Sequence, residues 1–273
     1  MAEGPREFGA YRLEEMVNRG GFSEIWLARH PSHRTVAVRR LINTSVFNFS
    51  ERSRFFHGCE VLQKLQGRDF IIGYVEHGRI DGTPFLAMEY LEASNLKLIL
   101  GRSDDLLQDY LGNILIDSAR ALEHVHDAGY MHLDFKPENL LVSRNANVRL
   151  IDFDLAQPKP DTPRKASKNP GTPAYMSPEQ LQRHPFDHRA DIFAFGVMAY
   201  ETVTLEKPFP GETPDEILRR QLDRSDFRHP SEINPGIPAA LEKTILRCLE
   251  TDPDLRYPFL SVVVRDLERA LYV

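Results

Sequence analysis

The residue types best suited to chemistry lie in one short polar stretch near the middle of the chain. From His132 to Asn139 the sequence reads His-Leu-Asp-Phe-Lys-Pro-Glu-Asn, and Asp152 follows further along. Asp134 is a carboxylate that can accept the proton of a hydroxyl group, and Lys136 is a nearby cation. Asn139 and Asp152 carry the oxygen ligands that a hard cation such as Mg²⁺ prefers. Phosphoryl transfer requires three parts, namely a general base, metal ligands, and a lysine that neutralises phosphate.

Two regions of different character must position these residues. Up to Tyr90, short β-prone runs alternate with turn signals, and one helical pattern from Ser50 to Leu65 places its apolar residues near one face. After Tyr90, long helical patterns dominate. This layout predicts a small sheet lobe with one main helix, a hinge near Glu89–Glu92 and a larger helical lobe, with the site in the cleft between the lobes. The clearest patterns are strands at 24–28, 35–41 and 140–142 and helices at 106–128, 192–202, 238–249 and 260–270.

The composition is that of a soluble globular chain of 273 residues, with 41% hydrophobic and 27% charged residues. A net charge of −6 argues against a nucleic-acid partner, which would need a basic stripe. Two distant cysteines, Cys59 and Cys248, indicate neither a disulfide framework nor a metal site and favour a reducing compartment. Because no stretch is apolar for long enough to span a membrane and the N-terminus lacks a signal-peptide core, we expect a cytoplasmic chain. Whether it is part of a longer protein stays open.

The polar stretch resembles the catalytic loop of protein kinases, His-Arg-Asp-x-x-x-x-Asn, and Asp152-Phe153-Asp154 resembles the Asp-Phe-Gly motif that follows that loop. The resemblance implies that Asp134 orients and deprotonates an acceptor hydroxyl and that Lys136 steadies the γ-phosphate. It also implies that Asn139 and Asp152 hold the metal ions. ATP with Mg²⁺ or Mn²⁺ would then be the cofactors.

Further motifs follow in the order in which kinases have them. The run from Gly171 to Glu179 resembles the substrate-docking end of the activation segment. By the same resemblance, Asp191 would brace the catalytic-loop backbone and Arg256 would pair with Glu179. The resemblance extends from about Tyr11 to Leu271, and its wording is most similar to the bacterial, eukaryotic-like serine/threonine kinases. It implies an α+β, two-lobed protein kinase-like fold in one domain at 11–273, with lobes at 11–90 and 91–273 and an activation segment at 152–179.

The nucleotide site implied by the resemblance lies mainly in the first lobe, where the match is weaker. From Asn18 to Ile25 the sequence takes the place of Gly-x-Gly-x-x-Gly-x-Val, and only the middle glycine, Gly20, matches outright. Asn18 suits the pattern because asparagine tolerates positive φ, and Ser23 because it is small. Adenine would lie between aliphatic side chains, beside a gatekeeper Met88 and the backbones of the hinge. The expected nucleotide-binding residues are Val17, Asn18, Gly20, Gly21, Ser23, Ile25, Ala37, Arg39, Met88, Glu89, Leu91 and Leu141.

The resemblance breaks where kinases have a lysine–glutamate ion pair. Arg39 stands in place of the lysine, and Gly58 stands where the helix glutamate is expected. Glu60 is near in sequence, but two residues turn a helix by about 200°, so it should face elsewhere. Arg39 would thus have no carboxylate partner and be free to turn to phosphate, so that Arg39→Lys is expected to speed transfer. Asp154, which replaces the motif glycine, would become an extra metal contact or a stiffer switch.

Leu133 replaces the catalytic-loop arginine that receives an activation-segment phosphate in many kinases. We therefore expect that phosphorylation at Thr162, Ser167 or Thr172 does not switch the domain on through that arginine.

Two functions stay open from the sequence. The first is an enzyme that transfers the ATP γ-phosphate to serine or threonine of a protein, with activity reduced by Arg39 and Gly58. The second is a catalytically inactive pseudokinase that senses nucleotide or docks a regulated protein partner. Retention of Asp134 and Asp152 favours the enzyme, and nothing in the sequence indicates the oligomeric state.

Overall fold

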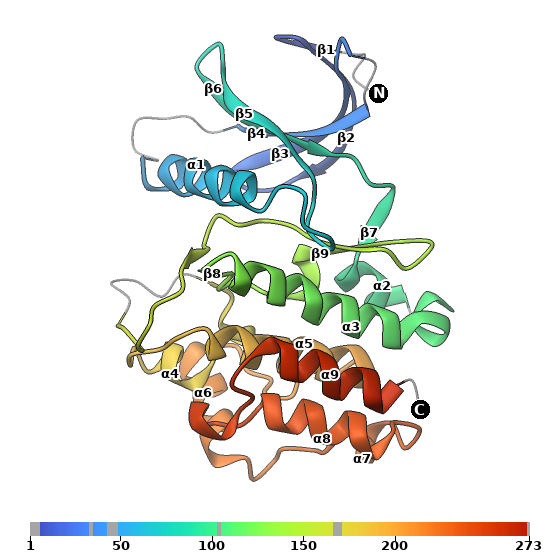
Figure 1. Ribbon diagram of the computed structural model, residues 1–273, viewed down its shortest axis with the longest axis vertical. Helices are drawn as coiled ribbons and strands as arrows, with labels where there is room; N and C mark the ends of the chain where they lie inside the picture. The colour runs from blue at the N-terminus through green and yellow to red at the C-terminus, as the bar shows by residue number, and fades with distance from the viewer. Residues whose placement is uncertain (1–5, 33–34, 43–48, 103–104, 166–170, 272–273) are drawn as a thin grey trace. The chain divides into compact units, whose positions relative to one another are not determined.

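The computed structural model describes residues 6–32, 35–42, 49–102, 105–165 and 171–271. These residues form two compact units (Figure 1). The first unit comprises the chain up to Glu92 together with Asp152–Asp154, and the second comprises Ala93–Ile151 and the chain from Leu155 onward. None of the helices in the described ranges has both the length and the apolar character needed to cross a membrane.

A six-stranded antiparallel sheet forms most of the first unit. Its side chains alternate between the two faces, as in β3, where Glu24, Trp26 and Ala28 are buried and their neighbours are less so. One face carries an aromatic and aliphatic core that includes Tyr11, Trp26 and Phe85. The strands, in the order β1-β2-β3-β4-β6-β5, are β1 (Arg6–Phe8), β2 (Tyr11–Arg19), β3 (Ser23–Arg29), β4 (Thr35–Leu41), β6 (Thr83–Glu89) and β5 (Tyr74–Ile80).

Helix α1 (Phe49–Lys64) packs against β5 and β6, as Figure 1 shows. Phe55, Cys59 and Leu62 are buried on one face, which confirms the helical pattern read from the sequence. Gly58 is also buried, whereas Glu60 is exposed, as its expected direction requires.

The second unit is mainly helical, and its centre is α5 (Arg189–Thr204), of which nearly every residue is buried. Helices α3 (Asp105–Asp127) and α8 (Ala239–Cys248) pack against it, and α9 (Leu260–Leu271) packs against α3 and α8. Gly196 allows α5 and α8 to approach closely, because a β-carbon there would lie 2.7 Å from the β-carbon of Cys248. The shorter helices are α2 (Leu96–Arg102), α4 (Pro178–Leu181), α6 (Pro214–Asp223) and α7 (Pro230–Ile233), with 3₁₀ turns η2 (Pro137–Asn139), η3 (Pro173–Tyr175) and η4 (Pro253–Leu255).

Short strands in this unit hold the catalytic loop between regular elements. β9 (Leu140–Ser143) pairs with β7 (Ala93–Asn95) and β10 (Val148–Leu150), and β8 (Tyr130–Met131) pairs with β11 (Gln157–Pro158). The loop of interest therefore begins after β8 and ends at β9. The sheet of the first unit and the helices of the second confirm the expected α+β class.

Candidate active site

The backbone of the catalytic loop is fixed by a buried carboxylate on α5. Asp191, which is 1% exposed, accepts hydrogen bonds from the N–H groups of His132 and Leu133, both at 2.8 Å. Its Oδ2 also lies 2.8 Å from His126 Nε2. Burial alone would raise the pKa of Asp191, but the His126 contact, the nearby histidine charges and the Leu133 N–H together lower it. Asp191 therefore braces the loop as an ionised side chain, in the role that the kinase resemblance implies.

Three polar side chains surround the expected general base, Asp134. The Lys136 ammonium donates to Asp134 Oδ2 and to Thr172 Oγ1, each at 2.8 Å. The Thr172 hydroxyl in turn lies 3.1 Å from Asp134 Oδ1, to which it donates. Asp134 is only 13% exposed and Lys136 only 19%. This closed set of contacts fixes the direction of both carboxylate oxygens of Asp134.

Asn139 completes this cluster from the end of the 3₁₀ turn η2. Its amide nitrogen donates to the backbone oxygen of Asp134 at 2.8 Å and to its Oδ2 at 3.2 Å. The Asn139 backbone oxygen accepts from Ile151 N–H at 2.9 Å. Because the amide nitrogen is turned toward Asp134, the amide oxygen is the side-chain atom that remains to bind a cation. The structure thus brings together Asp134, Lys136 and Asn139 of the predicted catalytic residues, all in the second unit.

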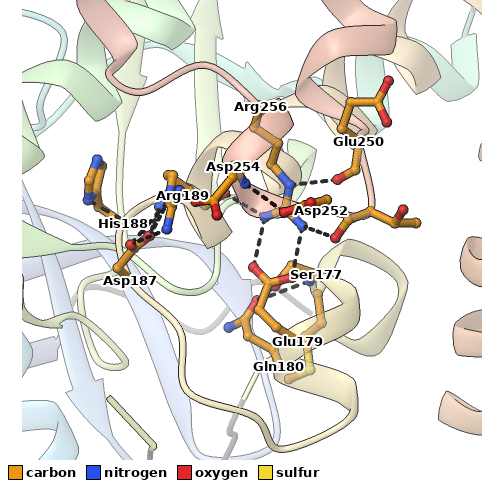
Figure 2. A network of polar contacts seen from close by, with 12 residues as sticks. Ser177, Glu179, Gln180, Asp187, His188, Arg189, Glu250, Asp252, Asp254 and Arg256 are labelled. Carbon is orange, nitrogen blue, oxygen red and sulfur yellow. Dashed lines mark hydrogen bonds and ion pairs between the residues drawn. The ribbon is translucent and has the colours of Figure 1, made fainter. Parts of the chain in front are cut away.

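The end of the activation segment is anchored by a buried ion pair, which Figure 2 shows. Arg256 donates to both carboxylate oxygens of Glu179, at 2.7 and 2.8 Å, and its side chain is 0% exposed. Its remaining N–H groups reach the backbone oxygens of Glu250, Thr251 and Arg189. Such a two-pronged, fully hydrogen-bonded pair gives fixed geometry as well as energy. The pairing expected between Glu179 and Arg256 is confirmed.

Arg39 has a carboxylate partner after all, and it is Asp154. Arg39 Nη2 lies 2.7 Å from Asp154 Oδ2 and Nη1 lies 3.1 Å from Oδ1, so the guanidinium grips both oxygens. Nη1 is also 3.4 Å from Asp152 Oδ1. The expectation that Arg39 would have no carboxylate partner is therefore wrong. Burial by itself would lower the pKa of Arg39, but the charges of Asp152 and Asp154 raise it above its ordinary value.

Gly58 lies against this ion pair. A β-carbon at position 58 would stand 2.5 Å from Asp154 Oδ1 and 2.9 Å from the N and Cα atoms of Asp154. Those distances are shorter than real β-carbon contacts, so glycine is the residue that this approach permits. Asp154 is largely buried by the contact, and burial raises its pKa while the charge of Arg39 partly offsets that rise. Asp152, two residues earlier, has a left-handed backbone with φ +63°, which is uncommon outside glycine and concentrates at functional sites.

The turn that replaces the glycine-rich loop is a regular one between β2 and β3. Gly20 N–H donates to Ser23 O at 2.8 Å, and a β-carbon at Gly21 would meet no atom of the described residues within 4 Å. Asn18 lies in extended strand β2, opposite Ile25, so the positive φ expected for it is not what the position requires. Ser23 Oγ accepts a hydrogen bond from Arg39 Nε at 3.4 Å.

Strands also carry several other residues that the sequence predicts to bind nucleotide. Ala37 of β4 pairs with Met88 of β6, and both are buried. Glu89 ends β6, with its N–H bonded to Gly73 O at 2.7 Å, and Leu91 follows it. Leu141 lies in β9 of the second unit. The expected metal ligands are divided between the units, Asp152 in the first and Asn139 in the second.

Comparison with known proteins places these motifs in one family. The family model of the protein kinase domain matches residues 11–266. The chain is 32% identical over 274 residues to the serine/threonine-protein kinase Pkn1 of Myxococcus xanthus, covering 96% of this chain and 38% of Pkn1. It is 30% identical over 254 residues to PknH of Mycobacterium tuberculosis, covering 92% of this chain and 40% of PknH.

A similar match is found to PknB of Mycolicibacterium smegmatis, which is 30% identical over 267 residues and covers 95% of this chain and 42% of PknB. The chain thus spans about two fifths of the length of these curated relatives. The family match and the arrangement of Asp134, Asp191 and Arg256 lead to one conclusion. The chain belongs to the protein kinase domain family.

Proposed function

We propose that this domain transfers the γ-phosphate of ATP to a serine or threonine hydroxyl of a protein. The observation that carries the proposal is the orientation of Asp134 by Lys136, Thr172 and Asn139. A carboxylate whose two oxygens are fixed in this way can direct an incoming hydroxyl and accept its proton. The ammonium of Lys136 is positioned next to it to offset the negative charge of phosphate.

The donor set fits a nucleotide-bound divalent cation. Among the described residues no three histidine, cysteine, aspartate or glutamate side chains form a group that could hold a metal ion by themselves. Mg²⁺ is usually bound by one or two protein oxygens together with substrate phosphates, and Asn139 and Asp152 supply an amide and a carboxylate of that kind. Bound there, the cation would neutralise charge on the phosphates. Val17, Gly20, Gly21, Ile25, Ala37, Met88, Leu91 and Leu141 would line the nucleotide.

The sheet-lobe substitutions predict slow transfer. Arg39 keeps the positive charge of the usual lysine, but its planar fork differs from an ammonium in shape and reach. Loss of one electrostatic contact to a transition state commonly costs on the order of 10²–10³ in rate. Because residues that act as a unit are not additive, Gly58 need not add a second factor of that size.

A second candidate is a pseudokinase that binds nucleotide or a partner protein without transfer. The observation that favours it is the pairing of Arg39 with both oxygens of Asp154, which commits much of the guanidinium to the protein. The intact cluster around Asp134 favours the enzyme. The two proposals differ in one measurable respect, namely transfer that depends on Asp134.

The deciding experiment measures transfer of labelled γ-phosphate to the domain itself and to a generic basic protein, with Mg²⁺ and with Mn²⁺. Asp134→Asn is the matched variant, since it keeps size and removes the base. We expect transfer by the wild type and its loss in Asp134→Asn. Equal transfer by the wild type and by Asp134→Asn would indicate a contaminating kinase and would refute the enzyme proposal. A rise in melting temperature with Mg·ATP tests nucleotide binding separately, because a ligand bound by the folded state raises stability.

A further inference from the structure

The carboxylate that pairs with Arg39 comes from an unexpected position. Within the described ranges Arg39 donates to Asp152 and Asp154 and to no carboxylate of helix α1, where Gly58 faces the ion pair and Glu60 is exposed. The carboxylate that contacts Arg39 most closely belongs instead to Asp154, two residues after Asp152. Its two oxygens lie 2.7 and 3.1 Å from the Arg39 guanidinium nitrogens. Arg39 of β4 thus has a carboxylate beside it, although position 58, where the helix glutamate was expected, is glycine.

Gly58 and Asp154 are complementary in shape. With a β-carbon at 58 placed 2.5 Å from Asp154 Oδ1, any side chain there would displace the carboxylate from Arg39. The same β-carbon would also stand 2.9 Å from the backbone N and Cα atoms of Asp154, so the close approach of the two backbones itself requires glycine at 58. Arg39, Gly58 and Asp154 therefore form one set of mutually contacting residues.

The set leaves Arg39 with capacity for a further anion. Its guanidinium has five N–H donors. The structure shows four donor contacts, from Nε to Ser23, from Nη1 to Asp152 and Asp154, and from Nη2 to Asp154. The guanidinium carbon also lies over the Phe55 ring, 5.3 Å from its centroid, in a cation–π contact that helps to hold the side chain. Within the described part of the chain, these contacts leave the second N–H of Nη2 for a phosphate oxygen.

We propose that Asp154 is the positioning residue that holds Arg39 for the nucleotide phosphates, in place of a carboxylate on helix α1, and that Gly58 is the space this exchange needs. The inference rests on the proposed function, because it takes the nucleotide from it. The opposing interpretation is that Asp154 keeps Arg39 away from phosphate. The two interpretations predict opposite signs when Asp154 loses its charge.

The first test is the affinity of purified Asp154→Asn for a fluorescent ATP analogue with Mg²⁺. The variant keeps the size of the side chain and removes the charge. If Asp154 positions Arg39, the dissociation constant should rise by about tenfold or more, since misplaced binding groups cost factors of this size. An unchanged or lower dissociation constant would overturn the proposal, and so would a wild-type domain that does not bind the analogue.

A double-mutant cycle separates positioning from general stabilisation. If Asp154 acts through Arg39, the double variant Arg39→Gln/Asp154→Asn should bind the analogue no more weakly than Arg39→Gln alone. A purely structural role predicts instead that the two losses add. Affinity is measured at a temperature at which urea unfolding shows every variant to be fully folded, so reduced stability does not enter the result.

The second test removes the space rather than the charge. Gly58→Ala should weaken analogue binding about as much as Asp154→Asn, because its methyl group displaces the Asp154 carboxylate. The loss should be smaller in an Asp154→Gly background, because no carboxylate is left there to displace and the contact with the backbone of residue 154 at 2.9 Å is common to both backgrounds. Gly101→Ala is the matched control, because it adds a methyl group in α2 where no atom of the described residues lies within 4 Å. Equal losses of affinity in both backgrounds would refute the shape complementarity. If Gly58→Ala does not fold, the double-mutant cycle with Asp154→Asn is the deciding test.

The third test reverses an expectation drawn from the sequence alone. Arg39→Lys cannot grip both oxygens of Asp154, so it should bind the analogue more weakly rather than speed transfer. Arg40→Lys, in the same strand and paired with Glu24, is the control and should bind like the wild type. Faster transfer and tighter binding by Arg39→Lys would overturn the proposal. Analogue binding needs no turnover and should persist in Asp134→Asn. Binding that depends on Asp154, in a domain that shows no transfer, would therefore reject the kinase activity and leave this inference intact.

Discussion

The backbone N–H of Leu133 donates to Asp191 Oδ1 at 2.8 Å, while Leu133 itself has a left-handed backbone with φ +62°. That conformation is unfavourable for a side chain of this size. A hydrogen bond to a buried, ionised carboxylate is among the stronger kinds and offsets the strain. The residue just before the proposed base is thus held in an uncommon conformation by one acidic side chain.

Replacing that carboxylate should change both stability and its pH dependence. The folded-state pKa of Asp191 lies below the ordinary aspartate value of 3.8, so the unfolded chain binds this proton more tightly. Its stabilising contribution is therefore complete above about pH 5 and is lost as the pH falls through the folded-state pKa. Urea unfolding between pH 2 and 6 should show a shallower acid decline in Asp191→Asn, with lower stability at neutral pH. A parallel decline in both proteins would contradict this.

The hydroxyl of Thr172 should be needed for fast transfer. It donates to Asp134 and accepts from Lys136, so Thr172→Val leaves both charged groups with one partner fewer. We expect initial rates to fall by about tenfold, in line with the effect of a misdirected catalytic group. Thr172→Ser keeps the hydroxyl and should stay close to the wild-type rate. If the valine variant were as fast as the serine variant, the hydrogen bonds would have no catalytic role.

Phosphorylation of the activation segment should not raise activity. Leu133, at the position of the usual phosphate-binding arginine, is 7% exposed and packs with Met131, Phe186 and Ala190. A phosphate at Thr172 would also bring negative charge beside Asp134 and lower the rate. Phosphatase treatment should therefore leave the rate unchanged or raise it.

Thr162 is exposed and open to the same test, and Ser167 lies outside the described residues. A strong activation that maps to any of these three positions would contradict the prediction.

Breaking the pair between Glu179 and Arg256 should be costly. Removing one partner leaves a buried charge uncompensated, for which about 3–5 kcal/mol of the free energy of unfolding is typical. Arg256→Met should therefore show a large loss in urea unfolding. Asp254→Asn is the control, because Asp254 is 84% exposed and its pair with Arg189 should be worth less than about 1 kcal/mol. Similar losses in the two variants would mean that burial does not set the cost.

Asp152→Asn should remove most of the effect of Mg²⁺ on nucleotide binding. The amide lacks the charge that a divalent cation needs, so the extra rise in melting temperature with Mg·ATP over ATP alone should shrink. The exposed Asp161→Asn serves as the control and should keep the full difference. An undiminished Mg²⁺ effect would exclude Asp152 as a ligand.

The sequence predicted those elements that have a long period or a local motif. The helices α3, α5, α8 and α9 were recognisable because their apolar residues repeat over several turns. Strands of two or three residues, such as β8 and β11, are too short to show alternation and were missed. The cluster of Asp134, Lys136 and Asn139 was predictable because these residues lie close together in the sequence.

The partner of Arg39 was not predictable in the same way. Arg39 and Asp154 are separated by 115 positions, and their contact depends on the paths of β4 and of the segment that carries Asp154. In the sequence, Gly58 indicated the loss of a carboxylate. In the structure, its use is to leave room for the close approach of Asp154. That use depends on distances between backbone atoms, which residue types do not encode.

The buried thiols have a practical consequence for spectroscopy. Cys59 and Cys248 are both buried, and burial raises the pKa of Cys59 to about 12 and that of Cys248 still further above its ordinary value. Neither should react with a maleimide dye while the protein is folded, because the thiolate is the reactive form. Two cysteines, one introduced into each unit, would then be the positions that react with the dyes. Energy transfer between the two dyes would report whether the distance between the labelled positions changes when nucleotide binds.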